Sequence, residues 1–85
     1  MVERGGSTMI QVLYFASMKE ASGLASERIK WQGGTLGEVM EKVTDLHPSI
    51  SWDGVRAALN EEFCSGAQEV EPGDTVAFIP PVSGG

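Results

Sequence analysis

The sequence has little of three things on which many protein functions depend: cysteine, basic side chains and long apolar runs. Its single cysteine, Cys64, excludes an internal disulfide and a zinc site built from several cysteines. Six basic residues stand against twelve acidic ones, which gives a formal net charge of −6. Nucleic-acid binders usually carry a large basic patch, and this chain has no material for one. We therefore expect neither a nucleic-acid partner nor a bound metal.

Apolar runs are also short. No stretch approaches the roughly 18–20 apolar residues that span a bilayer, and residues 1–8 lack the apolar segment of a signal peptide. The acidic excess disfavours anionic membrane surfaces and favours a basic protein partner. A single cysteine is consistent with a reducing compartment. We expect a soluble, cytoplasmic protein without a membrane partner.

The length of 85 residues suits one domain with a modest core. We expect three parts in this chain. Residues 1–8 are polar and glycine-rich, which predicts a disordered extension, and Met9 is an alternative start to Met1. Residues 9–79 form the domain, and residues 80–85 form an extended tail.

Four segments have the composition of strands, namely residues 9–16, 25–31, 55–60 and 75–79, and residues 63–64 are a candidate short return strand. In the first segment Val12 and Tyr14 fall on one face, whereas Leu13 and Phe15 fall on the other. Both faces are apolar, and spacing alone favours burial of both. The alternative is that Leu13 and Phe15 belong to an exposed binding surface.

The strongest local signal is a helix over residues 36–46. Thr35 and Glu38 have the spacing of a capping box, in which each side chain satisfies a free backbone N–H. Apolar residues then recur with the period of one helical face, at Leu36, Val39, Met40, Val43 and Leu46. Pro48 prevents continuation of the helix. We interpret this stripe as a face that packs on a sheet, not as a cofactor site.

Turns complete the predicted element order. Residues 17–23 predict a helical turn that ends at Gly23, and residues 70–74 predict a turn before the last strand. The order is strand, strand, helix, then strands. It indicates an α+β fold, with a mixed sheet of four to five strands crossed by one main helix.

The side chains suggest no assembled active site. A glycine-rich phosphate loop is absent from the sequence. His47 and Cys64 are far apart in the chain, and we interpret His47 as a cap or surface residue and Cys64 as a small hydrophobic residue. Trp31 and Trp52 are interpreted as packing residues.

The candidate site is therefore the tail, Pro80-Pro81-Val82-Ser83-Gly84-Gly85. It has no charged side chain, so its only ionisable group is the carboxylate of Gly85. The two prolines favour a stiff, extended chain, and the two glycines lack Cβ atoms, so a narrow channel of another protein could admit them. Six residues at about 3.3 Å each reach about 20 Å. The alternative is a frayed end without function.

A carboxylate is inert to nucleophiles until it is activated, for example as an acyl-adenylate whose AMP is a good leaving group. A sulfur nucleophile then converts it into a thiocarboxylate.

The outer faces of the first and last strands predict a docking surface at the root of this tail. If Val12, Tyr14, Val76 and Phe78 pack inward, the alternate residues of both strands face outward. Phe63 is a candidate to join them. An exposed apolar patch there would mark a binding surface. The predicted patch comprises Leu13, Phe15, Phe63, Ala77 and Ile79.

Several of these segments resemble the small subunit of molybdopterin synthase, the family of ubiquitin-like sulfur carriers often called MoaD. The matching segments are residues 12–16, 20–23, 35–39, 47–48, 58–60 and 73–85. The most specific is the Pro-Pro-Val-Ser-Gly-Gly ending. The resemblance implies a β-grasp fold and places partner contacts at Phe15, Phe63 and Ile79.

The same resemblance implies a mechanism. An ATP-dependent enzyme adenylates Gly85, a sulfur donor forms the thiocarboxylate, and residues 80–84 insert with it into the large synthase subunit. Sulfur then passes to cyclic pyranopterin monophosphate within a heterotetramer. The chain binds no cofactor, because ATP is used by the activating partner, and it is no enzyme on its own.

Three other functions remain open. The chain could carry sulfur for thiamine or cysteine biosynthesis, or it could be a ubiquitin-like modifier joined through Gly85 to target lysines. The third is an interaction module with an incidental tail. The full ending favours molybdopterin over the other carrier pathways.

Overall fold

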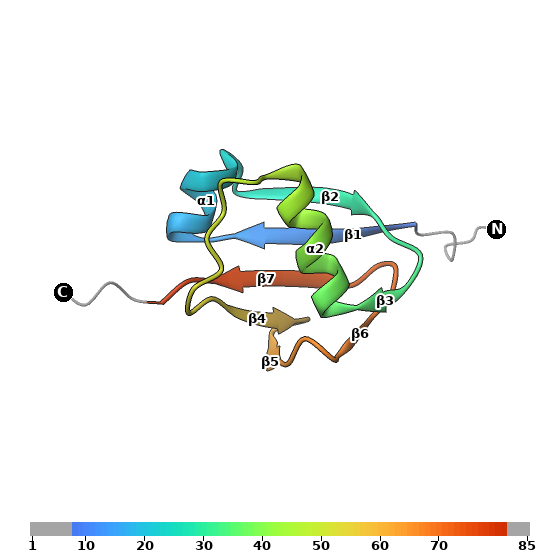
Figure 1. The fold of residues 1–85 in the computed structure, drawn as a ribbon. Helices are drawn as coiled ribbons and strands as arrows, with labels where there is room; N and C mark the ends of the chain where they lie inside the picture. Colours follow the sequence, from blue (N-terminus) through green and yellow to red (C-terminus); the bar gives the residue numbers. More distant parts are fainter. Residues whose placement is uncertain (1–7, 82–85) are drawn as a thin grey trace.

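The computed structural model describes residues 8–81. The expected extension, except Thr8, and the tail residues Val82, Ser83, Gly84 and Gly85 lie outside the described residues. The described residues form two helices and two sheets, whose arrangement is drawn in Figure 1. The helices are α1 (Ala16–Ser22) and α2 (Leu36–Leu46), and the strands are β1 (Met9–Tyr14), β2 (Ser26–Lys30), β3 (Gly34–Thr35), β4 (Arg56–Leu59), β5 (Glu62–Cys64), β6 (Glu69–Val70) and β7 (Thr75–Ile79).

The main sheet has five strands in the order β2-β1-β7-β4-β5. The first and last strands, β1 and β7, are neighbours and run parallel, with Val12 opposite Val76, while the other pairs are antiparallel. Helix α2 crosses one face of this sheet (Figure 1). The predicted α+β class, with a mixed sheet crossed by one main helix, is confirmed.

Helix α2 begins and ends where the sequence predicts. The capping box forms, since the Thr35 N–H donates to Glu38 Oε1 at 2.8 Å and the Glu38 N–H donates to Thr35 Oγ1 at 3.3 Å. At the other end His47 is the C-cap, and its N–H donates to the carbonyl of Val43. Pro48 follows and stops the helix.

The core lies between α2 and the sheet. The inward residues of β1 and β7 are buried together with Leu36, Val39 and Val43 of α2, and the largest of them are Tyr14 and Phe78. Met40 is partly buried against this core, but the predicted stripe is wrong at Leu46, the last residue of α2, which is 52% exposed.

The loop before β4 closes the core from one end, because Ile50 is buried and Trp52 meets the Phe78 ring edge-on, with 4.9 Å between the ring centroids. Trp31 and Trp52 are thus packing residues, as predicted.

Two short strands, β3 and β6, were missed by the sequence reasoning. A second sheet of two short strands pairs β3 with β6, so the prediction of a turn over residues 70–74 is wrong at Val70. Val70 is fully buried, and its carbonyl accepts a hydrogen bond from the indole nitrogen of Trp31 at 2.9 Å. Strands of two residues leave no alternating pattern, which explains why composition suggested only a turn.

Candidate functional site

A groove of about 500 Å³ lies on the face of the sheet opposite α2. Its apolar lining comes from alternate residues of β1, β4 and β7, whose neighbours in sequence point into the core, together with Phe15 and Phe63. Asn60, Glu61 and Thr75 add a polar rim. The apolar residues are Leu13, Phe15, Ala58, Phe63, Ala77 and Ile79.

The strand register explains why this face is hollow. Leu13 of β1 lies opposite Ala77 of β7, Ala77 lies opposite Ala58 of β4, and Ala58 lies opposite Phe63 of β5. One row across four strands therefore has two alanines in its middle and larger side chains at both ends. Alanine side chains end at Cβ, so the middle of the row forms a low floor between raised walls.

Solvent exposure decides whether both faces of the first predicted strand are buried or whether one belongs to an exposed surface. Phe15 is 45% exposed and Phe63 is 55% exposed, while Leu13, Ala77 and Ile79 are half-buried. The expectation that both faces of the first strand are buried is therefore wrong. The physical reason is that α2 covers only one face. Exposed aromatic side chains beside an apolar floor are what a protein docking surface requires.

The structure thus brings all five residues of the predicted patch to one groove. It adds Ala58, which sequence reasoning missed because strand register cannot be read from composition. The polar residues Asn60 and Glu61 were also not predicted at the site. Both have left-handed backbone conformations, with φ of 51° and 77°, in the turn that joins β4 to β5.

The predicted tail begins at the end of β7, next to the groove. Ile79 lines the groove and pairs with Arg56 of β4, after which Pro80 is half-buried and Pro81 is exposed. Prolines have no N–H to continue a strand ladder, so the hydrogen-bonded strand ends there. The chain leaves the sheet at the end of β7 (Figure 1), where Ile79 lines the groove.

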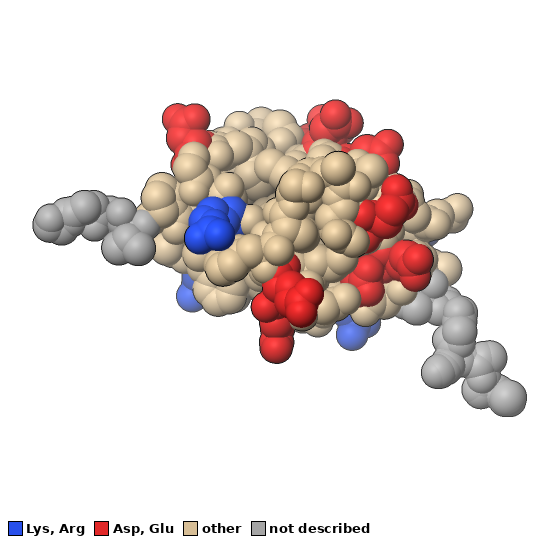
Figure 2. Space-filling view, turned by 90° about the horizontal axis from the view of Figure 1, so that it is seen from below, with Lys and Arg blue, Asp and Glu red and all other residues tan. Residues whose placement is uncertain are grey.

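Acidic side chains outnumber basic ones in this chain by twelve to six. Figure 2 shows acidic side chains spread over one view of the molecule, with basic ones at few places. Near the groove, the Arg56 guanidinium lies over the Phe63 ring at 4.0 Å from its centroid, which is a cation–π contact. The net charge of −6 favours a partner with a basic surface.

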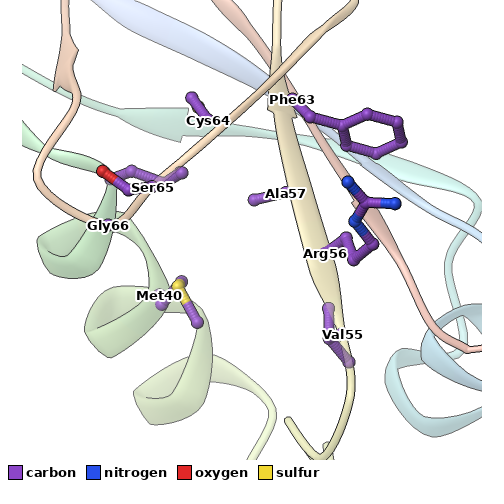
Figure 3. Close-up of a pocket in the computed structure, with 9 residues that line it drawn as sticks. Met40, Val55, Arg56, Ala57, Phe63, Cys64, Ser65 and Gly66 are labelled. Carbon is purple, nitrogen blue, oxygen red and sulfur yellow. The ribbon is translucent and has the colours of Figure 1, made fainter.

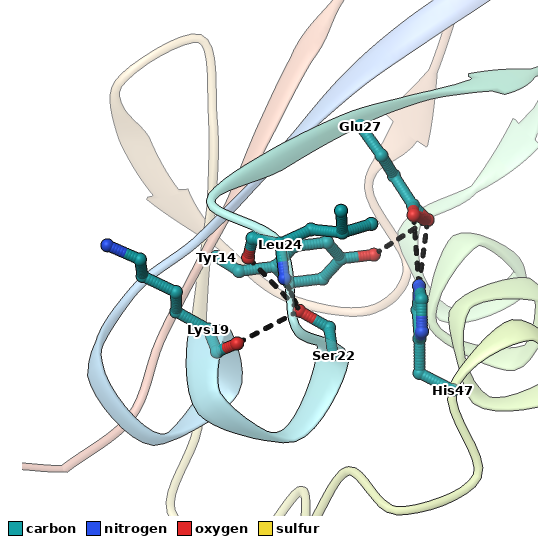
Figure 4. A network of polar contacts seen from close by, with 6 residues as sticks. All are labelled: Tyr14, Lys19, Ser22, Leu24, Glu27 and His47. Atoms are coloured by element: carbon teal, nitrogen blue, oxygen red, sulfur yellow. Dashed lines mark hydrogen bonds and ion pairs between the residues drawn. The ribbon is translucent and has the colours of Figure 1, made fainter.

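A polar network lies near the end of the sheet where α1 packs (Figure 4). Glu27 accepts a hydrogen bond from the Tyr14 hydroxyl at 3.2 Å and pairs with His47 Nε2 at 2.9 Å. Burial raises the pKa of Tyr14 well above its usual value, and the negative charge and hydrogen bond of Glu27 raise it further. The network joins β1, β2 and the end of α2, so it has a structural role.

A second cavity, of about 530 Å³, lies between α2 and strands β4 and β5 (Figure 3). Cys64 and Met40 line it, and the half-buried Cys64 packs against the core as the sequence suggested. Within residues 8–81, no three His, Cys, Asp or Glu residues are grouped to hold a metal ion. The two helices described are too short to cross a membrane.

The fold and the groove together define a class, the small β-grasp proteins. The crystal structure of small archaeal modifier protein 1 from Haloferax volcanii has the same fold, with a TM-score of 0.81 at 24% identity over 91% of this chain and 99% of that one. Residues 12–85 match the ThiS family, and the chain belongs to that family.

Two relatives carry a more specific name. The molybdopterin synthase sulfur carrier subunit of Arabidopsis thaliana is 34% identical, over 93% of this chain and 85% of its own length. The protein of the same name from Escherichia coli is 35% identical, over 91% of this chain and 100% of its own length. The resemblance to sulfur-carrier small subunits is thereby confirmed.

Proposed function

We propose that this chain is the sulfur carrier subunit of a molybdopterin synthase. The observation that carries the proposal is its likeness to two such subunits over about nine-tenths of the chain. The geometry supports it, because an apolar groove lies directly beside the point where a proline-stiffened segment leaves the central strand. A carrier needs both a dock for its partner and a projecting end.

The proposed chemistry takes place at Gly85. Its carboxylate oxygen attacks the α-phosphorus of ATP on an activating partner, releasing pyrophosphate and forming an acyl-adenylate. Sulfur at the oxidation level of hydrosulfide then attacks the carbonyl carbon, the bond to AMP breaks, and a thiocarboxylate results. The anionic sulfur attacks a carbon of cyclic pyranopterin monophosphate, and water then cleaves the C–S bond to Gly85, which returns the carboxylate and leaves one sulfur on the pterin. A dithiolene has two sulfurs and therefore consumes two loaded carriers. This chain contributes the carried sulfur, while its partners supply ATP binding, pterin binding and catalytic side chains.

The groove gives this function a recognition surface. We propose that Phe15, Phe63 and Ile79 contact the large synthase subunit, and that Pro80, Pro81, Val82, Ser83 and Gly84 enter its active site with Gly85. Glycine at the last two positions suits a narrow channel, because neither has a side chain to exclude. Two carriers on a central dimer of large subunits give the expected heterotetramer.

Intact mass spectrometry tests the carrier function. The protein is incubated with a candidate adenylating enzyme, ATP and a sulfur donor, and a mass gain equal to one oxygen-to-sulfur exchange at Gly85 is expected. A variant lacking Gly84 and Gly85 is the control, since it should fold normally and gain no sulfur. A wild-type protein that remains unmodified with every such enzyme would contradict the proposal.

A modifier function is the second candidate, because small archaeal modifier protein 1 shares the fold. It requires the same adenylate but ends in an isopeptide bond between Gly85 and a lysine amine. The same experiment separates the two, since lysine conjugates without thiocarboxylate would favour a modifier. Adding the large subunit and cyclic pyranopterin monophosphate then tests the pathway: molybdopterin should form, whereas a carrier for thiamine or cysteine synthesis would give none.

A further inference from the structure

Gly54 lies against the root of the tail. In the antiparallel pair of β4 and β7, Arg56 is opposite Ile79. Both strands end at that pair, and Gly54 precedes β4 by two residues as Pro81 follows β7 by two. A Cβ atom built on Gly54 would lie 3.0 Å from Cγ of Pro81, 3.4 Å from its Cδ and 3.5 Å from its Cβ. The proline ring therefore occupies the space that a side chain at residue 54 would need.

The loop that carries Gly54 is firmly held. Ile50 is buried, and its N–H donates to the His47 carbonyl at 3.1 Å. Trp52 packs edge-on against Phe78, and its indole nitrogen donates to Thr44 Oγ1 at 2.8 Å. The loop is thus fixed both to α2 and to the strand that leads into the tail. Gly54 is a fixed support for Pro81.

The β4–β7 hydrogen-bond ladder cannot hold the tail in place beyond Ile79. Neither Pro80 nor Pro81 has an N–H with which to extend the ladder to β4. The direction of the chain beyond Ile79 therefore depends on the fixed φ of the prolines and on what their rings touch. Gly54 has a φ of +70°, which favours glycine, and its lack of a side chain lets Pro81 lie flat on the backbone.

We propose that Gly54 is a positioning residue, which sets the direction in which the tail leaves the sheet through its contact with Pro81. It acts on the reactive end only through that proline. The consequence for sulfur loading rests on the proposed function, whereas the contact itself does not. A substitution at residue 54 should lower the rate at which the tail is loaded with sulfur, without changing the groove.

The test is Gly54→Asn, with Gly23→Asn as the matched control. Asparagine tolerates the left-handed conformation better than most residues, and Gly23 has nearly the same φ, +77°, with nothing within 4 Å of an added Cβ. With the adenylating enzyme, the kcat for thiocarboxylate formation should fall about tenfold in Gly54→Asn, because a misplacement of about 1 Å can cost about 100-fold and the 3.0 Å contact requires a smaller shift. The Kd for the enzyme and the kcat of Gly23→Asn should not change.

A second substitution tests whether Gly54 acts through Pro81. Pro81→Ala removes Cγ and Cδ, the two nearest atoms, so adding Gly54→Asn to it should lower kcat much less than in the wild type. A full tenfold loss in that background would overturn the inference, as would an unchanged kcat in Gly54→Asn alone. An equal loss in Gly23→Asn would also overturn it.

Nuclear magnetic resonance decides the contact independently of any activity. A nuclear Overhauser effect between the Gly54 Hα and the Pro81 ring protons is expected in the wild-type protein, and its absence would refute the inference. If wild-type protein gains no sulfur, the proposed function fails, and this measurement still decides whether Gly54 supports Pro81.

Discussion

Replacing Phe15 by alanine should weaken partner binding while leaving the fold intact. The side chain is 45% exposed at the edge of the groove. A phenylalanine has about 200 Å² of surface, so about 90 Å² remains to be buried by a partner. At about 25 cal/mol per Å², that area is worth about 2 kcal/mol, which corresponds to a Kd about 30-fold higher.

Isothermal titration calorimetry against the molybdopterin synthase large subunit measures this effect. Leu24→Ala is the matched control, because Leu24 is also exposed, at 39%, but does not line the groove. The free energy of unfolding of Phe15→Ala should fall by at most about 3 kcal/mol, because the other roughly 110 Å² of the side chain is buried within the domain. Phe78→Ala shows the contrast, because truncation of a fully buried phenylalanine costs about 3–5 kcal/mol.

The reasoning would be refuted in either of two ways. One is a Phe15→Ala variant that binds the large subunit as tightly as the wild type. The other is a loss of affinity no greater than that of Leu24→Ala, which would show that exposed apolar area contributes wherever it lies. A variant that loses folding stability but binds normally would assign Phe15 to the core.

Three further predictions concern stability, each measured by urea unfolding. Above pH about 10, the free energy of unfolding should fall by up to about 1.4 kcal/mol per pH unit, because the unfolded chain loses the Tyr14 proton that the folded protein retains. Tyr14→Phe should remove that part of the slope. Glu61→Gly should stabilise by about 0.5–1 kcal/mol, because residue 61 has a φ of 77° and glycine avoids most of that cost. Thr35→Ala should destabilise by about 1 kcal/mol through loss of the N-cap.

A specific result would contradict each of these three stability predictions. Tyr14 is the sole tyrosine, so its ionisation can be followed by ultraviolet absorbance, and a midpoint near pH 10 in the folded protein would contradict the raised pKa. A less stable Glu61→Gly would mean that the left-handed turn carries little strain. An unchanged Thr35→Ala would show that the capping box is dispensable.

Local signals in the sequence predicted most of the elements. The capping box and Pro48 located both ends of α2, because helix ends depend on side chains within one turn. Alternation located β7 at residues 75–79 for the same reason. The pair of strands β3 and β6 was missed, since each has two residues and gains its stability from a distant partner.

The residues of the candidate site also differ in whether local sequence signals could predict them. Leu13 and Ile79 could be assigned to an outer face from the alternation of their own strands. Ala58 and Gly54 could not, because their importance comes from what lies next to them in another segment of the chain. An alanine in a groove floor and a glycine beneath a proline carry no local signal.

The central position of β7 has a mechanical consequence. The tail is continuous with a strand that is bonded on one side to β1 and on the other to β4. A force along the tail therefore loads two ladders in shear, so their hydrogen bonds bear it together rather than opening one after another. An edge strand would have only one ladder to bear the same pull. The chain end can thus be pulled hard without unravelling the domain behind it.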